Sequence, residues 1–338
     1  MKNTQVVLAQ RPEGAPKAND FAVVETETVP LEDGQALVKN LYISLDAGFR
    51  NWMDEDSGDE VLPAMPLGKA VMGLILGEVI ESRNSGIEVG CLLMARLAWE
   101  EFSVVNEGDW WVEVDNEHQL PLSYHLGVLG DTGMSGYFGL VDIGQPKPGD
   151  TVVVSSASGA VGAVVGQIAK IGGCRVIGIA GSDEKVSYVV DELGFDAGIN
   201  YKAENVSEAL GLVAPDGVDC YFDNVGGPIT EAVMEHLAMY SRTVICGRIS
   251  EYNESEPSMG PRILRYLHST RSRIQGFTVN QYPAQFEDGR AQLARWVKSG
   301  EIKYKEDIIE GFENCPRAFI GQLGGANFGK LLIKVSDE

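Results

Sequence analysis

Cysteine and histidine are scarce in this chain, with 5 Cys and 4 His among 338 residues. No two cysteines form a C-x-x-C pair, and before residue 125 there is only one Cys, Cys91, and one His, His118. These counts exclude a four-cysteine zinc lobe, and neither residue belongs to a group with metal-ligand spacing. The odd number of cysteines argues against a disulfide framework. We therefore expect no bound metal and a reducing, cytoplasmic setting.

Positive charge is also in short supply. Lys and Arg number 27 against 49 Asp and Glu, which gives a net charge of −22. This mean field would repel a polyanionic nucleic acid or an anionic membrane surface, so neither is expected as a partner. The first 14 residues hold no long apolar run, so no signal peptide is expected. A small molecule is the expected partner.

The chain is long enough for two domains. Up to residue 125, short apolar or alternating runs are separated by Gly, Pro, Asn and Asp, which predicts a β-rich domain. From residue 126, strand and helix patterns alternate, which predicts a parallel, doubly wound α/β domain. We expect the first domain over 1–125, completed by 306–338, and the second over 126–305. Predicted strands of the second domain are 151–154, 175–180, 198–201, 218–222, 243–246 and 274–279; predicted helices are 160–171, 183–193, 203–212, 228–239 and 284–299.

A glycine-rich turn marks the start of the second domain. Residues 156–162, SASGAVG, follow an apolar strand and open a helix. This is a variant of G-x-G-x-x-G, in which Gly159 would let the backbone approach a pyrophosphate and Gly162 would let the helix pack closely on the sheet. The motif alone is weak, and a purely structural turn is the alternative. Because the following βα units agree with it, the sequence predicts a dinucleotide site formed by Gly159, Ala160, Val161 and Gly162.

The end of the next predicted strand distinguishes NAD from NADP. An NAD site usually has an Asp or Glu there, but this chain reads GIAGS at 178–182, with Lys185 shortly after. A missing carboxylate and a nearby lysine favour a ribose 2′-phosphate. Tyr201, at the end of the third predicted strand, has a hydroxyl that can donate to the same group. The alternative for Lys185 is a solvated charge on a helix. We expect NADPH as the cofactor.

Several stretches together resemble the zinc-independent medium-chain reductases of the prostaglandin reductase (leukotriene B4 12-hydroxydehydrogenase) type, which include plant 2-alkenal reductases and bacterial curcumin reductases. The resemblance covers essentially the whole chain and is most distinctive at DCYFDNVGG, 219–227. The other stretches are 44–46, 136–140, 159–170, 181–185, 200–202, 246–253 and 309–314. It implies a GroES-like domain plus a Rossmann domain, and a homodimer joined through an edge strand near 274–279.

The resemblance also implies an activity and a set of site residues. The activity is NADPH-dependent reduction of the C=C bond of α,β-unsaturated ketones and aldehydes, with hydride added to the β-carbon. Tyr252 would be the catalytic residue, donating to the carbonyl oxygen where negative charge builds up; its alternative is a packing role. Further implied cofactor contacts are Asn224, Cys246, Tyr252, the backbone of Phe277, Thr278 and Val279, and Asn327. As alternatives, Phe277 is a core residue, and Asn224 and Asn327 are turn formers.

One departure from the family pattern affects the substrate pocket. Many members read DPYMR where this chain has Asp46-Ala47-Gly48-Phe49-Arg50, so a proline and a tyrosine are missing. Gly48 and Phe49, with Tyr252, are the predicted pocket residues, and Gly48 should leave extra room. Two other functions remain open: an NADPH:quinone oxidoreductase, and a cofactor-binding protein without relevant turnover.

Overall fold

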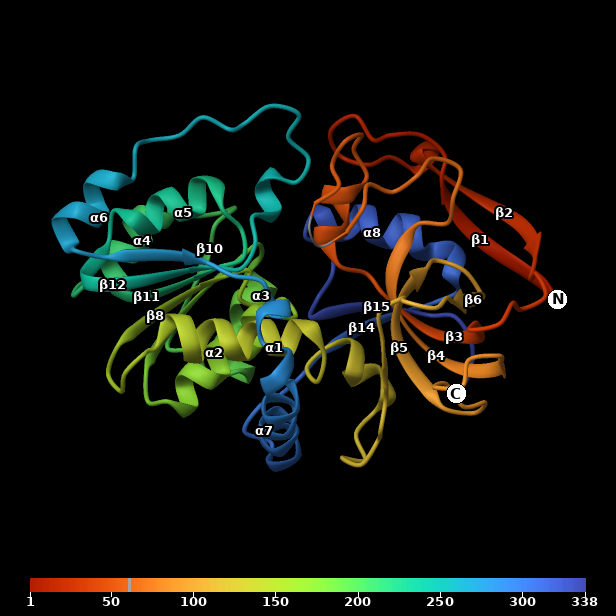
Figure 1. The fold of residues 1–338 in the computed structure, drawn as a ribbon. Helices are drawn as coiled ribbons and strands as arrows, with labels where there is room; N and C mark the ends of the chain where they lie inside the picture. The colour runs from red at the N-terminus through yellow and green to blue at the C-terminus, as the bar shows by residue number, and fades with distance from the viewer. Residues whose placement is uncertain (60–61) are drawn as a thin grey trace. The chain divides into compact units, whose positions relative to one another are not determined.

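The computed structural model describes residues 1–59 and 62–338 and divides into two compact units. Unit 1 comprises Met1–Leu126, Glu306–Asn327 and Leu331–Glu338, and unit 2 comprises Gly127–Lys305 and Phe328–Lys330 (Figure 1). Among the described residues, no helix combines the length and apolar character needed to cross a membrane.

Unit 1 is built on antiparallel strands. Its main sheet has the order β14-β15-β3-β4-β5-β7, with β6 paired to β3, and β1 and β2 form a separate pair. Trp99 and Phe319 are fully buried in its core, and their rings meet edge to face. The strands are β1 (Lys2–Leu8), β2 (Phe21–Glu27), β3 (Ala36–Ser44), β4 (Met72–Ser82), β5 (Leu92–Ala98), β6 (Phe102–Val105), β7 (Trp111–Glu113), β14 (Glu306–Glu310) and β15 (Lys330–Lys334), and the helix is α8 (Cys315–Leu323).

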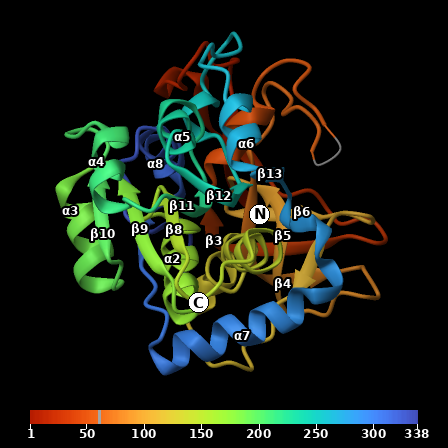
Figure 2. The same cartoon turned by 90° about the vertical axis from the view of Figure 1, so that its left-hand side faces the viewer.

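Unit 2 holds a six-stranded, fully parallel sheet. Its order is β10-β9-β8-β11-β12-β13, which Figure 2 shows in sequence. In chain order this is 3-2-1-4-5-6, the arrangement of dinucleotide-binding sheets, whose ligands sit outside the carboxyl ends of the strands. The strands are β8 (Thr151–Ser155), β9 (Arg175–Ala180), β10 (Ala197–Asn200), β11 (Val218–Asp223), β12 (Leu237–Ile245) and β13 (Arg273–Gly276).

Helices cover both faces of this sheet. In Figure 1, α4, α5 and α6 lie on one side, and α1 and α2 lie on the other. The first three pack against buried side chains of the sheet, including Val153, Ile177 and Tyr221. The helices of unit 2 are α1 (Asp131–Phe138), α2 (Gly162–Ile171), α3 (Asp183–Ser187), α4 (Val206–Val213), α5 (Gly227–Met234), α6 (Leu264–Thr270) and α7 (Phe286–Ser299). The α/β class and the parallel sheet agree with the sequence prediction.

Two predicted elements of unit 2 end in the wrong place. The helix predicted over 228–239 stops at Met234, and residues 237–239 already belong to β12. The pairing of β12 with β11 jumps from Leu237 to Arg242 across two residues of β11, so the residues between are looped out, and Tyr240 has a φ of 61°. Because this bulge interrupts the alternation of a regular strand, the local pattern imitated a helix. The strand predicted over 274–279 ends at Gly276, and Val279 begins a short 3-10 helix.

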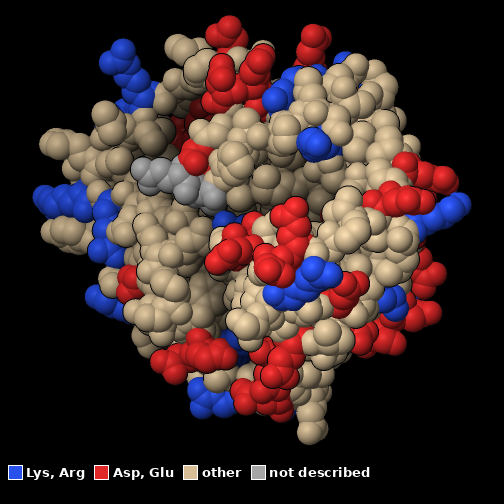
Figure 3. All heavy atoms as spheres, turned by 45° about the vertical axis from the view of Figure 1, so that its right-hand side comes forward, with Lys and Arg blue, Asp and Glu red and all other residues tan. Residues whose placement is uncertain are grey.

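Charge on the surface follows the composition. On the face drawn in Figure 3, Asp and Glu gather in several patches, whereas Lys and Arg are dispersed among them. With a net charge of −22, such a surface repels polyanions at long range.

Candidate cofactor site

The glycine-rich turn between β8 and α2 is held by close backbone approach. A Cβ at Gly162 would lie 2.3 Å from the Ser156 carbonyl oxygen, and one at Gly159 would lie 3.0 Å from the Ser156 hydroxyl. Ser156 itself has a φ of 51°, which bends the chain sharply after the strand. A side chain at Gly162 would require the backbone to shift, whereas one at Gly159 would require Ser156 to move by a few tenths of an ångström.

This turn presents N–H groups at the edge of the sheet. The Ala163 N–H donates to the Gly159 carbonyl at 3.0 Å, so helical bonding begins at Gly159. The N–H groups of Ala160, Val161 and Gly162 therefore precede the first intrahelical donor, and they point out of the helix N-terminus. Together with the helix dipole, they form a site suited to a pyrophosphate.

The second strand of the sheet ends in a compact turn that contains two of the predicted residues. Ser182 caps α3 by accepting the Lys185 N–H at 3.2 Å. Asn200 donates its amide to the Asp183 carboxylate at 2.7 Å, which ties β10 to α3. The Tyr201 hydroxyl lies 3.1 Å from where a Cβ of Gly181 would be, so glycine at 181 lets the ring lie over the end of β9. Lys185 and Tyr201 thus both flank the end of the second strand.

The turn after β11 is organised by a buried carboxylate. Asp223 is 1% exposed, and its two oxygens accept hydrogen bonds from five donors. These are the hydroxyls of Ser155, Tyr221 and Thr230 and the N–H groups of Val225 and Gly226. Burial, reinforced by the Asp223 charge, raises the pKa of Tyr221 well above its usual value, so Tyr221 remains a donor. Sequence reasoning quoted Asp223 in a motif but assigned it no role.

Asn224 serves the same turn. Its N–H donates to the Ser155 hydroxyl and its side-chain amide donates to the Ser155 carbonyl, both at 2.8 Å. The side chain therefore joins the ends of β8 and β11, which is the turn-forming role. Its amide oxygen carries none of these contacts, so a cofactor contact through that oxygen remains a prediction.

Cys246 and Tyr252 are the predicted site residues that follow the end of β12. The Cys246 N–H donates to the Asp223 carbonyl at 2.8 Å. Burial, with a smaller contribution from the Asp223 charge, raises the pKa of the Cys246 thiol to about 12. The Tyr252 hydroxyl accepts the Arg248 N–H at 3.3 Å and lies 3.2 Å from where a Cβ of Gly247 would be. Tyr252 is thus folded back over the end of the strand, beside an exposed Arg248 whose guanidinium lies 5.7 Å from the ring centroid.

Phe277 follows the end of β13 and has a packing role. A Cβ at Gly139 would lie 2.6 Å from its ring and 2.8 Å from the Phe222 ring, so Phe277 packs into the interior of unit 2. The side chain is half-buried, and a ligand contact through its backbone remains a prediction. Thr278 and Val279 follow it directly on the surface side, at the start of a short 3-10 helix.

Unit 1 holds the other predicted residues. A Cβ at Gly48 would have no neighbour within 4 Å, so the backbone there borders open space. Phe49 is 9% exposed and packs edge to face with Trp52 in the core, which restricts any pocket role to a small part of the ring. Asn327 also belongs to unit 1 and is half-buried. The roles of these three residues toward a ligand remain predictions.

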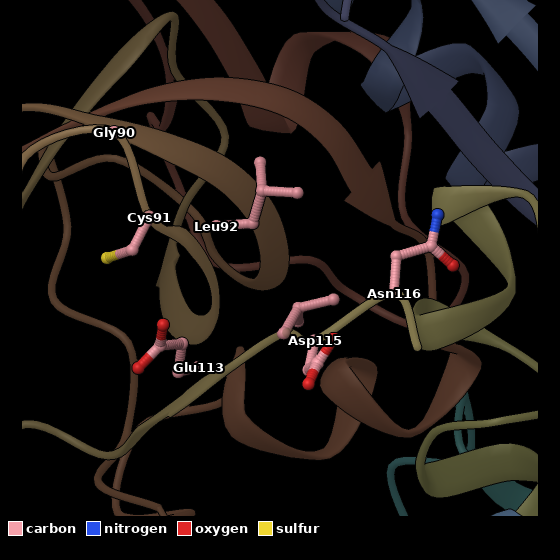
Figure 4. A pocket seen from close by; sticks show the side chains of 7 residues that line it. Gly90, Cys91, Leu92, Glu113, Asp115 and Asn116 are labelled. Atoms are coloured by element: carbon pink, nitrogen blue, oxygen red, sulfur yellow. The ribbon is translucent and has the colours of Figure 1, made fainter. Parts of the chain in front are cut away.

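A separate depression in unit 1 contains none of the predicted residues. Figure 4 shows its lining, which includes Cys91, Glu113, Asp115 and Asn116. Burial, and then the nearby Glu113 charge, raises the pKa of the Cys91 thiol. A protonated thiol among carboxylates is a weak metal ligand. Within residues 1–59 and 62–338, no three His, Cys, Asp or Glu side chains gather as a metal site requires.

Comparison with known proteins identifies the family. Two family models match the chain, one described as the N-terminal domain of oxidoreductase, over residues 4–113, and one as zinc-binding dehydrogenase, over residues 160–296. YfmJ of Bacillus subtilis is 50% identical over 98% of each chain, and the NADPH-dependent curcumin reductase of Escherichia coli is 38% identical over 100% of this chain and 98% of its own. Prostaglandin reductase 1 of Rattus norvegicus is 40% identical over 95% and 96%. The chain belongs to the medium-chain dehydrogenase/reductase family.

Solved structures of this family agree with the fold. CurA from Vibrio vulnificus in complex with NADPH has a TM-score of 0.92 and 38% identity, and the match covers 99% of this chain and 100% of that one. The quinone oxidoreductase of Escherichia coli, also solved with NADPH, has a TM-score of 0.75 at 19% identity and shares the fold alone. The medium-chain fold predicted from the sequence is therefore confirmed, with its β-rich and Rossmann parts.

The residues of this medium-chain reductase fit a dinucleotide. The close approach at Gly159 and Gly162 makes a cradle that a Cβ would fill, and the helix start supplies N–H donors. At the end of β9, no carboxylate ends the strand, and Lys185 supplies a cation where a ribose phosphate would lie. Two nearby residues were not predicted from the sequence. The Phe328 ring lies near the Lys185 ammonium, and the Lys305 ammonium lies near the same ring. The glycine-rich stretch just before Phe328 was the only local signal for them.

Proposed function

We propose that this protein uses NADPH to reduce the C=C bond of α,β-unsaturated ketones and aldehydes. The observation that carries the proposal is the combination of a Rossmann site with a cation at the end of β9 and whole-length similarity to reductases named for curcumin, prostaglandins and 2-alkenals. The named substrates differ in size, but curcumin and 2-alkenals share a C=C bond conjugated to a carbonyl. That shared group is the substrate class proposed here.

The side chains around the end of β12 support a role in orienting the carbonyl. When bound, NADPH would supply a hydride to the β-carbon of such a substrate, and negative charge would build on the carbonyl oxygen. A proton from solvent or from Tyr252 would then complete the reduction at the α-carbon. The Tyr252 hydroxyl accepts the Arg248 N–H, and a hydroxyl that accepts a hydrogen bond becomes a stronger donor. A donor aimed at the carbonyl oxygen stabilises the transition state more than the ground state. Tyr252 is therefore our candidate for this donor.

The predicted substrate pocket distinguishes this chain from many relatives. Gly48 removes a tyrosine that many members carry and borders open space. With no hydroxyl and no ring at this position, we expect bulkier enones to be accepted and polar recognition through that tyrosine to be lost. Substrate preferences of tyrosine-bearing relatives therefore do not carry over.

The proposal is tested by following NADPH oxidation at 340 nm against a panel of enones, 2-alkenals and quinones, with product analysis. Saturated carbonyl products from enones are expected, and Tyr252→Phe should lower kcat roughly tenfold or more while the Kd for NADPH stays unchanged. Turnover of quinones alone would favour the quinone oxidoreductase alternative. Tight NADPH binding without turnover of any substrate would favour a non-enzymatic cofactor-binding role.

Two further properties belong to the same proposal. The family resemblance favours a homodimer, with β13 as the exposed edge strand of the parallel sheet. Sedimentation as a monomer at micromolar concentration would contradict it. A cytoplasmic location is supported by five free cysteines with no disulfide among the described residues, because a reducing compartment keeps thiols free.

A further inference from the structure

A three-residue segment close to the C-terminus belongs to unit 2 and contacts the glycine-rich turn. The Gly329 N–H donates to the Ser158 carbonyl at 3.1 Å, and Gly329 and Gly159 form a parallel β-bridge. The next N–H, of Lys330, donates to the Lys305 carbonyl at 3.0 Å. Gly329 has a φ of 78°, and a Cβ there would lie 2.2 Å from the Lys305 carbonyl oxygen. The backbone on one side of Phe328 is thus fixed to the cofactor turn and to residue 305.

The ammonium groups of two lysines lie near the Phe328 ring. The Lys305 ammonium is 3.8 Å from its centroid and the Lys185 ammonium is 6.0 Å from it. Tyr188 packs edge to face with Phe328, with centroids 4.8 Å apart, and its own ring lies 5.2 Å from the Lys305 ammonium. An aromatic face attracts a cation, so these rings hold the two ammonium groups in one place.

An anion bound beside the Phe328 ring would be attracted by both ammonium groups. Lys185 lies in α3, directly after β9, where the adenosine ribose of a dinucleotide is bound in this sheet order. A 2′-phosphate carries close to two negative charges and would neutralise both ammonium groups. In a chain of net charge −22, such a pair of cations is a local exception.

We propose that Lys305 and Phe328 are specificity-determining residues for the 2′-phosphate of NADPH. Phe328 positions the ammonium groups of Lys185 and Lys305, and Lys305 adds the second charge that favours NADPH over NADH. This inference rests on the proposed function, because it assigns residues to the same cofactor site. It joins two segments, around residues 185 and 305, that lie 120 positions apart in the sequence.

The test compares the Kd values for NADPH and NADH in the full-length protein. Lys305→Met should raise the Kd for NADPH about tenfold and leave that for NADH within about twofold, since a charge-assisted contact is worth about 1.4 kcal/mol or more. Phe328→Leu should raise the NADPH value about threefold with NADH again unchanged, and Phe328→Tyr should restore it because the ring is kept.

The matched control is Lys303→Met, which removes one positive charge from the same segment. The Lys303 ammonium faces the exposed Glu192 carboxylate at 3.5 Å, so both Kd values should stay unchanged. If the Lys305 or Phe328 variants weaken NADPH and NADH binding equally, the role of these residues is merely structural and the proposal is overturned. Unchanged Kd values for both cofactors in these variants would also overturn it. If the unaltered protein itself shows no preference for NADPH, the proposed function fails instead.

Discussion

Two turns at the same edge of the parallel sheet are built by opposite means. The turn after β8 is held by the close approach of backbone at Gly159 and Gly162, and its helix-start N–H groups face outward. The turn after β11 is held by a buried carboxylate, Asp223, which accepts the N–H groups of Val225 and Gly226. The N–H groups of the first turn therefore remain available to bind an anion. The N–H groups of the second turn already donate to the Asp223 carboxylate. Only the first is suited to a pyrophosphate.

The largest effect is expected at the first turn. A Cβ at Gly162 would overlap the Ser156 carbonyl, so Gly162→Ala should lower the free energy of unfolding by about 3 kcal/mol and weaken NADPH binding about 100-fold or more. Urea unfolding and cofactor titration measure both. The control is Gly211→Ala in α4, where a Cβ would lie 3.6 Å from His236 and a gain of about 1 kcal/mol is expected. Unchanged binding in Gly162→Ala would contradict this account of the turn.

A smaller effect is expected at the second turn. Asp223→Asn replaces an acceptor-only group by an amide that faces five donors, so the free energy of unfolding should fall by about 2 kcal/mol in a urea titration. NADPH binding should weaken less than in Gly162→Ala. As a control, Asp219→Asn, on the same strand, keeps an amide oxygen that can accept the single bond from the Thr151 N–H, so it should cost about 1 kcal/mol at most. Equal losses in the two variants would mean that Asp223 is not the centre of its turn.

The difference between the turns also explains what the sequence revealed. Close approach at Gly159 and Gly162 is a local requirement, so glycine spacing after an apolar strand predicts the turn. Four of the five donors to Asp223 lie within 7 residues of it, but the Ser155 hydroxyl comes from β8, 68 positions away, and no local spacing predicts that contact. Local spacing does not predict the positions of Lys305 and Phe328 either. The chain next to Phe328 is held at the glycine-rich turn by the bridge between Gly329 and Gly159. The bulge in β12 was missed because its residues break the alternation that identifies a strand.

The next prediction concerns Lys185 at the proposed 2′-phosphate site. It separates contacts to the 2′-phosphate, which only NADPH carries, from contacts to the pyrophosphate, which both cofactors carry. Lys185→Ala removes one ammonium group near Phe328, so KM for NADPH should rise about tenfold while KM for NADH changes little. Steady-state kinetics with both cofactors measure this. A change of the same size for NADH would place Lys185 with the turn residues, which contact the part that both cofactors share.

The smallest effect is expected at Cys246, beside the second turn. Its thiol pKa is raised to about 12 by burial and then by the Asp223 charge, so the thiol stays protonated across the range from pH 7 to 9. Because the thiolate is the reactive form, iodoacetamide should not label Cys246 in the folded protein at pH 8, and labelling should appear only on unfolding in urea. Mass spectrometry of tryptic peptides measures this. In Asp223→Asn the loss of the charge removes only the minor cause, so protection should persist while the turn remains folded. Because the side chain is half-buried, rapid labelling of the native protein would contradict the raised thiol pKa and show that the thiolate forms readily at pH 8.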